Sequence, residues 1–121
     1  MNRPIVVKIG GSLLRSGTAT PLLRALPART HARLAIVPGG GAFADAVRTA
    51  QGDHHLSDIA AHHMALLAMD MSARMIVDLA HGYAVADTRD AFDAAWSSQT
   101  IPVWAPTRMT TADAIRQPLI T

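Results

Sequence analysis

The sequence predicts an α/β fold built on a mainly parallel sheet. Two short apolar runs, residues 5–9 and 33–37, have the pattern of buried strands, and each ends in glycines that lead towards a helix. A strand, a glycine turn and a helix, repeated along a chain, are typical of βα units in a parallel sheet. With 121 residues, half of them apolar, the chain is long enough for one domain with its own core, and we expect that domain to cover residues 1–121.

The other elements follow from turn and cap signals. Thr20 and Pro21 predict the start of a helix that Pro27 ends, because proline lacks a backbone donor and clashes with the preceding turn. The second glycine run leads directly into a helix over residues 42–49, and a polar turn follows at residues 51–56. The later elements are a long helix over residues 58–81, a weak strand at 83–86, a short helix at 90–97, a strand at 101–104 and a helical turn at 111–116.

The long helix carries apolar residues on more than one side. Ser57 is a plausible N-cap for it and Gly82 ends it. A helix this apolar is expected to be buried on several sides, against the sheet and against a partner subunit. Its methionines are more typical of core filling than of a ligand site.

Composition and charge exclude several function classes. The net charge is only +2, the arginines are scattered and aromatic residues are few, so nothing supports binding to nucleic acid. The chain has no cysteine, which excludes disulfides and thiolate chemistry. Its first apolar stretch is too short for a signal peptide and no run reaches transmembrane length, so we expect a soluble cytoplasmic protein without a membrane partner.

One lysine stands among ten arginines, and its position is informative. Lys8 comes at the end of the first apolar run, directly before Ile9-Gly10-Gly11-Ser12. A lysine offers a compact charge on a flexible stem, which suits an anion that moves or changes during a reaction. Lys8 followed by Gly-Gly-Ser therefore predicts a phosphate site. The alternative is a strand end with a solvated lysine and a tight turn.

A second glycine run strengthens the phosphate interpretation. Gly39, Gly40 and Gly41 follow the second strand, and a helix starts there. Glycines after a strand let the backbone approach a ligand and direct N–H groups at it, and the helix adds its positive end. Two such loops after neighbouring parallel strands would face each other at the carboxyl edge of the sheet, where α/β proteins bind ligands. The pair predicts a site where two anionic groups meet.

Two other nucleotide-binding motifs fit less well. The first loop lacks the spacing of a Walker A motif and has its lysine before the glycines. Residues 39–44 formally match G-x-G-x-x-A, but a dinucleotide site needs an acidic residue at the end of the next strand, about twenty residues on. The corresponding stretch, residues 53–58, is a turn entering a helix. The next strand does end at an acidic residue, Asp87, but this residue lies much too far along the chain.

Together, residues 7–13 and 37–41 resemble the two N-terminal motifs of the amino acid kinase family, the aspartate/glutamate/uridylate kinase fold. Residues 41–45 and 61–70 are also similar to the small phosphate kinases of methanofuran-type cofactor synthesis, which phosphorylate an aminomethyl-furan phosphate. The resemblance implies a three-layer αβα sandwich around a mainly parallel sheet. It implies an ATP-dependent kinase that uses Mg²⁺ and acts on a small molecule carrying a phosphate, carboxylate or amine.

The resemblance also implies roles for individual residues. Lys8 would be catalytic and neutralise charge on the transferred phosphoryl group, and it would bind the nucleotide's terminal phosphates together with Gly10, Gly11 and Ser12. The second loop, Gly39, Gly40 and Gly41, would hold the acceptor. Magnesium would bridge the phosphates with few protein ligands, so no metal-binding residue is assigned.

Some polar residues keep two interpretations. Asp45 lies one helical turn after Gly41, so it is a candidate to bind the acceptor, or it is a first-turn acid that favours the helix dipole. Ser12 is alternatively a turn or cap residue. A metal stripe of His55, Asp58 and His62 is conceivable, but a solvated or capped helix start is the better interpretation.

The chain departs from the family pattern in one respect. Family members carry a C-terminal half that binds adenosine and supplies a second lysine, whereas this sequence has no second lysine and ends where that half would begin. We therefore expect either a kinase that works with a complementing C-terminal half or a truncated or degenerate relative acting as an anion-binding or assembly subunit. Apolar surface left exposed in such a chain predicts a homo-oligomer.

Overall fold

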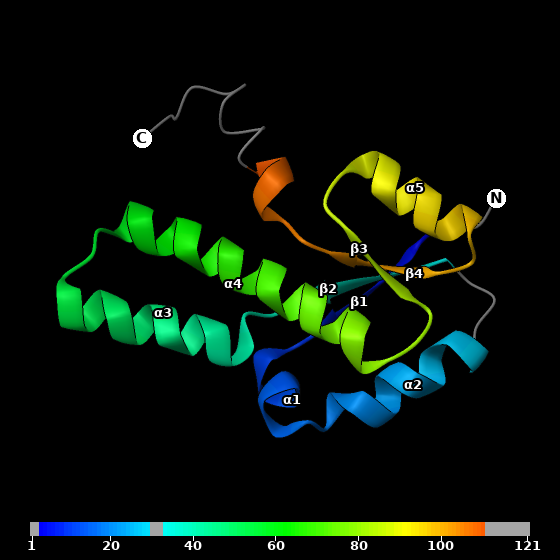
Figure 1. Cartoon of the computed structure of the whole chain (residues 1–121), viewed down its shortest axis with the longest axis horizontal. Helices are drawn as coiled ribbons and strands as arrows, with labels where there is room; N and C mark the ends of the chain where they lie inside the picture. Colours follow the sequence, from blue (N-terminus) through cyan, green and yellow to red (C-terminus); the bar gives the residue numbers. More distant parts are fainter. Residues whose placement is uncertain (1–2, 30–32, 111–121) are drawn as a thin grey trace.

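Strands and helices alternate along the computed structural model, which describes residues 3–29 and 33–110 (Figure 1). Within these residues the strands are β1 (Ile5–Ile9), β2 (Leu34–Pro38), β3 (Tyr83–Ala86) and β4 (Ile101–Trp104). The helices are α1 (Gly11–Ser16), α2 (Ala19–Arg29), α3 (Gly41–His54), α4 (Asp58–Leu79) and α5 (Arg89–Ser97). The predicted α/β class is confirmed.

All neighbouring strands of the sheet run parallel, in the order β1-β2-β4-β3. Along β1 and β2, Ile5 lies opposite Leu34 and Ile9 opposite Pro38. The last strand, β4, is inserted between β2 and β3, so β1 and β3 form the two edges in the described part of the chain. Since the strands are parallel, the ends of β1 and β2 lie side by side at the carboxyl edge.

Helices cover both faces of the sheet. On one face, Ile36 of β2 and Val103 of β4 pack with Ile76 of α4, and all three side chains are fully buried. The helix α5 contacts β3 and β4, and it lies on the opposite side of the sheet from α2 (Figure 1). The indole Nε1 of Trp96 in α5 donates a hydrogen bond to the Leu34 carbonyl at 2.9 Å. The chain is thus the three-layer αβα arrangement that the resemblance implies.

The prediction that Pro27 ends the second helix is wrong. The helix α2 continues through Pro27 to Arg29. Proline has no N–H for the carbonyl four residues earlier, which is that of Leu23. The hydroxyl of Tyr83 donates to the Leu23 carbonyl at 2.6 Å instead, so a contact from β3 satisfies the acceptor that proline leaves open.

Two further helical segments differ from expectation. The third helix continues to His54, through most of the stretch predicted as a polar turn, because α3 packs along α4 and gains stability from that contact. The six-residue helix α1 is not apparent from the sequence, and its buried Leu14 holds it against the core. The expected turn at residues 111–116 lies outside the described residues.

The hairpin of α3 and α4 extends beyond the carboxyl edge of the sheet (Figure 1). The 22 residues of α4 span about 33 Å, whereas a five-residue strand spans only about 17 Å. The end of α4 therefore packs on the sheet, while the part that extends beyond the sheet packs on α3. None of the described helices has the length and apolar character needed to cross a membrane.

Candidate functional site

The two glycine loops meet backbone to backbone at the carboxyl edge. The Gly39 N–H donates to the Ile9 carbonyl at 2.8 Å, which joins the two loops where their strands end. A Cβ placed on Gly39 would lie 2.9 Å from the Gly11 nitrogen, and one placed on Gly11 would lie 3.2 Å from the Gly41 nitrogen. Side chains at positions 11 and 39 would push the loops apart, so the close contact between the loops requires glycine at both positions.

Two more glycines are explained by the turn into α3. Gly41 has a φ of +57°, in the left-handed region that favours glycine. A Cβ on Gly40 would lie only 2.3 Å from the Cβ of Ala44. Both positions therefore need glycine to let α3 start directly from β2.

Gly10 is different from the other loop glycines. Its φ of −68° and ψ of 157° are open to any residue, and a Cβ placed there would meet nothing within 4 Å. The fold alone therefore gives no reason for glycine at this position. A backbone that must be approached closely from outside gives one, and that open side is where a ligand of the first loop would lie.

Lys8 is exposed beside this contact, on β1 opposite Val37. Because strand side chains alternate, Lys8 points to the opposite face from Ile9, which is buried in the core. Within residues 3–29 and 33–110 the Lys8 ammonium has neither an ion-pair nor a hydrogen-bond partner. Lys8 is thus available, among the described residues, to bind an anion. Ser12, which is also exposed, lies just beyond the first loop.

The second loop is held in position by a hydrogen bond from Ser72, a residue that the sequence analysis did not identify. The fully buried Ser72 of α4 donates from its hydroxyl to the Gly40 carbonyl at 3.2 Å. A lone serine within an apolar stretch of helix was the available signal, but its partner is 32 positions away in the sequence. Through Ser72, the long helix holds the loop in place.

Asp45 forms an ion-pair group that links α1 to α3. Arg15 of α1 makes a forked contact to Asp45 of α3, with Nε–Oδ2 at 2.6 Å and Nη2–Oδ1 at 3.1 Å, and Arg48 binds the same carboxylate. The pKa of the Asp45 carboxyl is lowered below its usual value, most strongly by the hydrogen bonds from Arg15 and to a smaller extent by the one from Arg48. The same Arg15 side chain lies next to Gly11, so the group adjoins the contact between the loops. Arg15 and Arg48 were not among the predicted site residues.

The ends of the other two strands add polar groups to this edge. Asp87 follows β3 and forms an ion pair with Arg108 at 3.5 Å. Thr107, just after β4, donates from its backbone N–H to Asp70 of α4 at 3.2 Å. These contacts join the carboxyl edge to the long helix and to a helical turn at residues 107–110.

The histidine stripe considered from the sequence does not form a ligand cluster. Asp58 accepts a hydrogen bond from the Gln51 amide at 3.0 Å, as a helix-start residue would. His62 contacts His63 edge to face. Across the ranges that the structure describes, no three histidine or acidic side chains come together as metal ligands.

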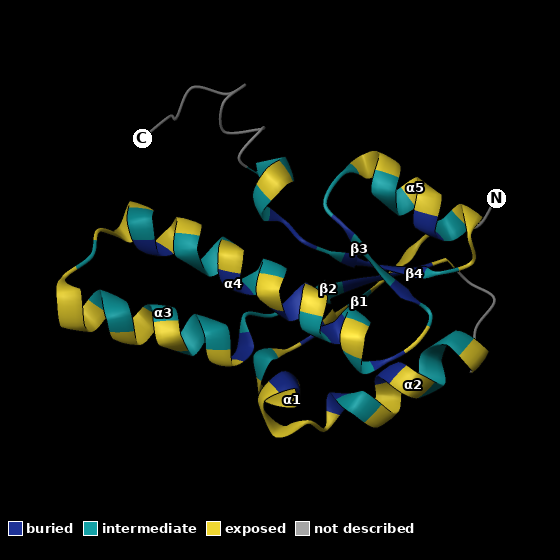
Figure 2. Cartoon of the chain, in the orientation of Figure 1, coloured by how far each residue is buried: buried dark blue, intermediate teal, exposed yellow. Residues whose placement is uncertain are grey.

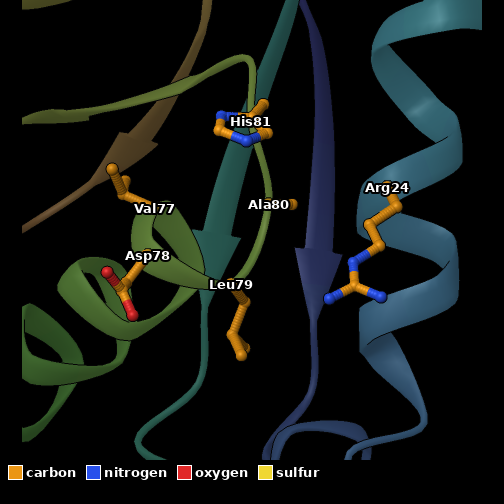
Figure 3. Close-up of a pocket in the computed structure, with 6 residues that line it drawn as sticks. All are labelled: Arg24, Val77, Asp78, Leu79, Ala80 and His81. Atoms are coloured by element: carbon orange, nitrogen blue, oxygen red, sulfur yellow. The ribbon is translucent and has the colours of Figure 1, made fainter.

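A surface pocket of about 700 Å³ lies elsewhere on the molecule. It is formed between α2 and the end of α4, just before β3 begins, so it belongs to the amino-edge side of the sheet and not to the glycine loops (Figure 3). It contains none of the predicted site residues. Its lining residues are Arg24, Val77, Asp78, Leu79, Ala80 and His81.

Comparison with known proteins identifies the family of the chain. The profile of the amino acid kinase family matches residues 3–111, which include both glycine loops and the whole sheet. The chain belongs to the amino acid kinase family. Among relatives with an assigned activity, it is 34% identical over 79 residues to [5-(aminomethyl)furan-3-yl]methyl phosphate kinase of Methanocaldococcus jannaschii. That match covers 63% of this chain and 36% of the relative.

Solved structures support the same fold. The crystal structure of uridylate kinase from Archaeoglobus fulgidus superposes with a TM-score of 0.63 over 92% of this chain, at 16% sequence identity. At that identity the likeness is one of fold. The chain covers 58% of the uridylate kinase chain and about a third of the archaeal phosphate kinase, so it corresponds to part of each protein.

Proposed function

We propose that this chain supplies the phosphate-binding part of an ATP-dependent phosphotransferase that acts on a small molecule. The observation that carries the proposal is the backbone contact between two glycine loops beside an uncommitted lysine. Phosphoryl transfer depends on positioning and charge stabilisation more than on covalent chemistry. Main-chain N–H groups and one mobile cation are the groups that such a reaction needs from this edge of the sheet.

Each loop has a proposed role. The amides of Gly10 and Gly11, with Ser12, would hold the terminal phosphates of ATP, and Lys8 would neutralise charge on the phosphoryl group in transit. The second loop, residues 39–41, would hold the acceptor against the first. Bound ATP supplies the phosphoryl group, and Mg²⁺ held through phosphate oxygens lowers its charge.

The proposed acceptor class is an aminomethyl-furan phosphate or a similar small phosphate with an amine. The archaeal relative is named for such a substrate, and its match to this chain is the basis of this step. Asp45 is the proposed contact for the amine, since Arg15 and Arg48 keep its carboxylate ionised and its side chain is 45% exposed. The two guanidiniums next to it would favour a negatively charged acceptor.

A second candidate function is a non-catalytic one. The chain corresponds to only 36% of the archaeal phosphate kinase and 58% of the uridylate kinase chain. A chain that binds anions through its loops, but needs a complementing C-terminal half for catalysis, would fit these figures. The two candidates differ in whether the chain alone forms product.

The test begins with isothermal titration of ATP–Mg²⁺ into the full chain and two variants. Lys8→Met removes the charge at the loops, and we expect ATP affinity to fall about tenfold or more, which corresponds to about 1.4 kcal/mol. The matched control, Arg24→Met, removes one positive charge at the pocket between α2 and α4 and should bind like the wild type. Wild-type binding that survives Lys8→Met unchanged would contradict the assignment of Lys8.

Product formation then separates the two functions. Phosphorus NMR of the chain with ATP–Mg²⁺ and an aminomethyl-furan phosphate should show ADP and a new phosphoryl ester or anhydride if the chain is a complete catalyst. Binding that depends on Lys8, without turnover, supports the anion-binding subunit. The absence of any ATP binding would reject the autonomous kinase.

A further inference from the structure

The guanidinium of Arg15 lies where the two glycine loops meet. Its Nη2 is 3.3 Å from the place that a Cβ on Gly11 would take, and that same Cβ would lie 3.2 Å from the nitrogen of Gly41. The helix α1, which carries Arg15, packs against α3, and Figure 2 shows exposed and half-buried stretches on both helices. The Arg15 side chain is itself 41% exposed, so a ligand can reach it from solvent.

Only one edge of this guanidinium is used in the contact with Asp45. A guanidinium carries five N–H donors in one plane. The Nε and Nη2 atoms of Arg15 each donate to one oxygen of Asp45. Within residues 3–29 and 33–110, no acceptor takes the N–H groups of the other edge, which is formed by Nη1 and Nη2. Two parallel N–H groups of this kind bind two oxygens of one phosphate.

Asp45 holds the guanidinium in a fixed direction. The pKa of the Asp45 carboxyl is lowered, most strongly by the hydrogen bonds from Arg15, so the carboxylate that makes the fork is ionised at neutral pH. An arginine held by such a fork loses less side-chain freedom when it binds a ligand than an arginine that moves freely. The free edge of Arg15 is therefore prepared for an anion.

We propose that Arg15 binds the phosphate of the acceptor with this free edge, at the junction of the two loops. The inference rests on the proposed function, because it assigns a residue within the proposed acceptor site. A phosphate monoester has three terminal oxygens, so it can accept hydrogen bonds from Arg15 and from loop amides at the same time. Two phosphate groups that meet at this junction repel each other, and Lys8 is the only lysine of the chain. Arg15 supplies a second cation there.

Arg48 provides an internal comparison. It binds the same carboxylate, but from within α3, three residues after Asp45, and its side chain is 66% exposed. Arg48 is not among the nearest neighbours of the loop glycines, whereas Arg15 is. The two arginines thus have the same charge and the same partner, and differ in their position relative to the loops.

The first test is a titration of the full chain with inorganic phosphate, without nucleotide, followed by phosphorus NMR. Arg15→Met should raise the dissociation constant for phosphate about tenfold or more, because a charge-assisted bidentate contact is lost. Arg48→Met removes the same charge away from the loops and should raise it no more than about threefold. A wild type that does not bind phosphate, or equal losses in the two variants, would overturn the inference.

A lysine at the same position separates the planar edge from the charge. Arg15→Lys keeps the positive charge but offers a single ammonium group, which cannot use two edges for a carboxylate and a phosphate. We expect its phosphate affinity to be at least about threefold below that of the wild type. Wild-type affinity in Arg15→Lys would show that charge alone is sufficient and would refute the bidentate contact.

A comparison of two ligands separates this inference from the proposed function. Arg15→Met should weaken phosphate binding more than ATP–Mg²⁺ binding, whereas Lys8→Met should weaken ATP–Mg²⁺ binding more than phosphate binding. If both variants affect the two ligands in the same order, Arg15 does not define an acceptor subsite and the inference is refuted. The proposed function fails instead if ATP–Mg²⁺ binding is insensitive to Lys8→Met, so each failure is recognised with a different ligand.

Discussion

Gly10 and Gly40 are in the same pair of loops for different physical reasons. Gly40 is required by the chain itself, because a Cβ would lie 2.3 Å from that of Ala44. Gly10 has an ordinary extended backbone with open space where a Cβ would be. Gly40 is therefore required by the fold, whereas the fold gives no reason for glycine at position 10, where we propose that a ligand approaches the backbone.

Replacing each glycine with alanine should separate stability from binding. Gly40→Ala should lower the free energy of unfolding by about 1–3 kcal/mol through overpacking. Gly10→Ala should keep it or raise it by about 0.4–1 kcal/mol, because alanine restricts the unfolded chain, yet weaken ATP binding about tenfold. Urea unfolding and calorimetric titration of both variants measure these effects. A Gly10→Ala protein that binds ATP as the wild type does would remove the proposed role of that amide.

At the scale of elements, α2, α4 and the sheet are joined by a few long-range polar contacts. The hydroxyl of Tyr83 reaches across from β3 to the Leu23 carbonyl, which the proline four residues later cannot satisfy. In the same way, the hydroxyl of Ser72 in α4 donates a hydrogen bond to the Gly40 carbonyl of the second loop. These contacts fix the relative position of elements that apolar packing alone would leave free to slide.

The Tyr83 contact should be visible as a pH-dependent difference in stability. Tyr83→Phe leaves the Leu23 carbonyl without its donor and should lower the free energy of unfolding by about 1–3 kcal/mol at neutral pH. Burial raises the pKa of Tyr83 to about 12, above the ordinary value of 10.0. The neutral hydroxyl thus stabilises the fold fully below pH 10, and this contribution is lost as the pH rises towards 12.

Urea unfolding of the wild type and of Tyr83→Phe between pH 7 and pH 12 measures this difference. Tyr83 is the only tyrosine of the chain, so the other titrating groups are common to both proteins and cancel. If the difference in the free energy of unfolding between the two proteins stays constant up to pH 12, the ionisation of the Tyr83 hydroxyl does not affect folding stability.

The parts of the fold that depend on neighbouring residues could be predicted from the sequence. The β1 strand ends at Ile9 as expected, and the glycines that follow form both loops, because β-branched runs and glycine act within a few residues. Pro27 was misread because its consequence depends on Tyr83, 56 positions later. The full length of α3 depends likewise on its packing against α4.

The candidate site shows the same division. The sequence singles out Lys8 and the two loops, since lysine among arginines and glycines after strands are local signals. The Arg15–Asp45 fork and the bond from Ser72 to Gly40 join residues 30 and 32 positions apart, and no local pattern pairs them. Short motifs thus indicate candidate site residues, while the groups that position those residues can be identified only from the tertiary structure.

At the scale of the whole molecule, stability should fall from the sheet to the tip of the α3–α4 hairpin. Near its end α4 buries Ala73 and Ile76 in the core, whereas the part beyond the sheet packs on α3. Amides 72–79 should therefore exchange at least tenfold more slowly than amides 59–66. Hydrogen exchange followed by mass spectrometry measures this gradient. Uniform protection along α4 would mean that the hairpin unfolds only with the whole domain.

The backbone contact between the loops also limits how this protein can change over evolutionary time. Main-chain atoms are the same in every sequence, so substitutions cannot retune the junction of Gly11, Gly39 and Gly41; they can only keep it or break it. Under the proposed function, a change of acceptor would instead come from exposed neighbours such as Ser12 and Ala42. A mutant library that seeks altered substrates should therefore hold the glycines constant and diversify the rim, where variation is compatible with folding.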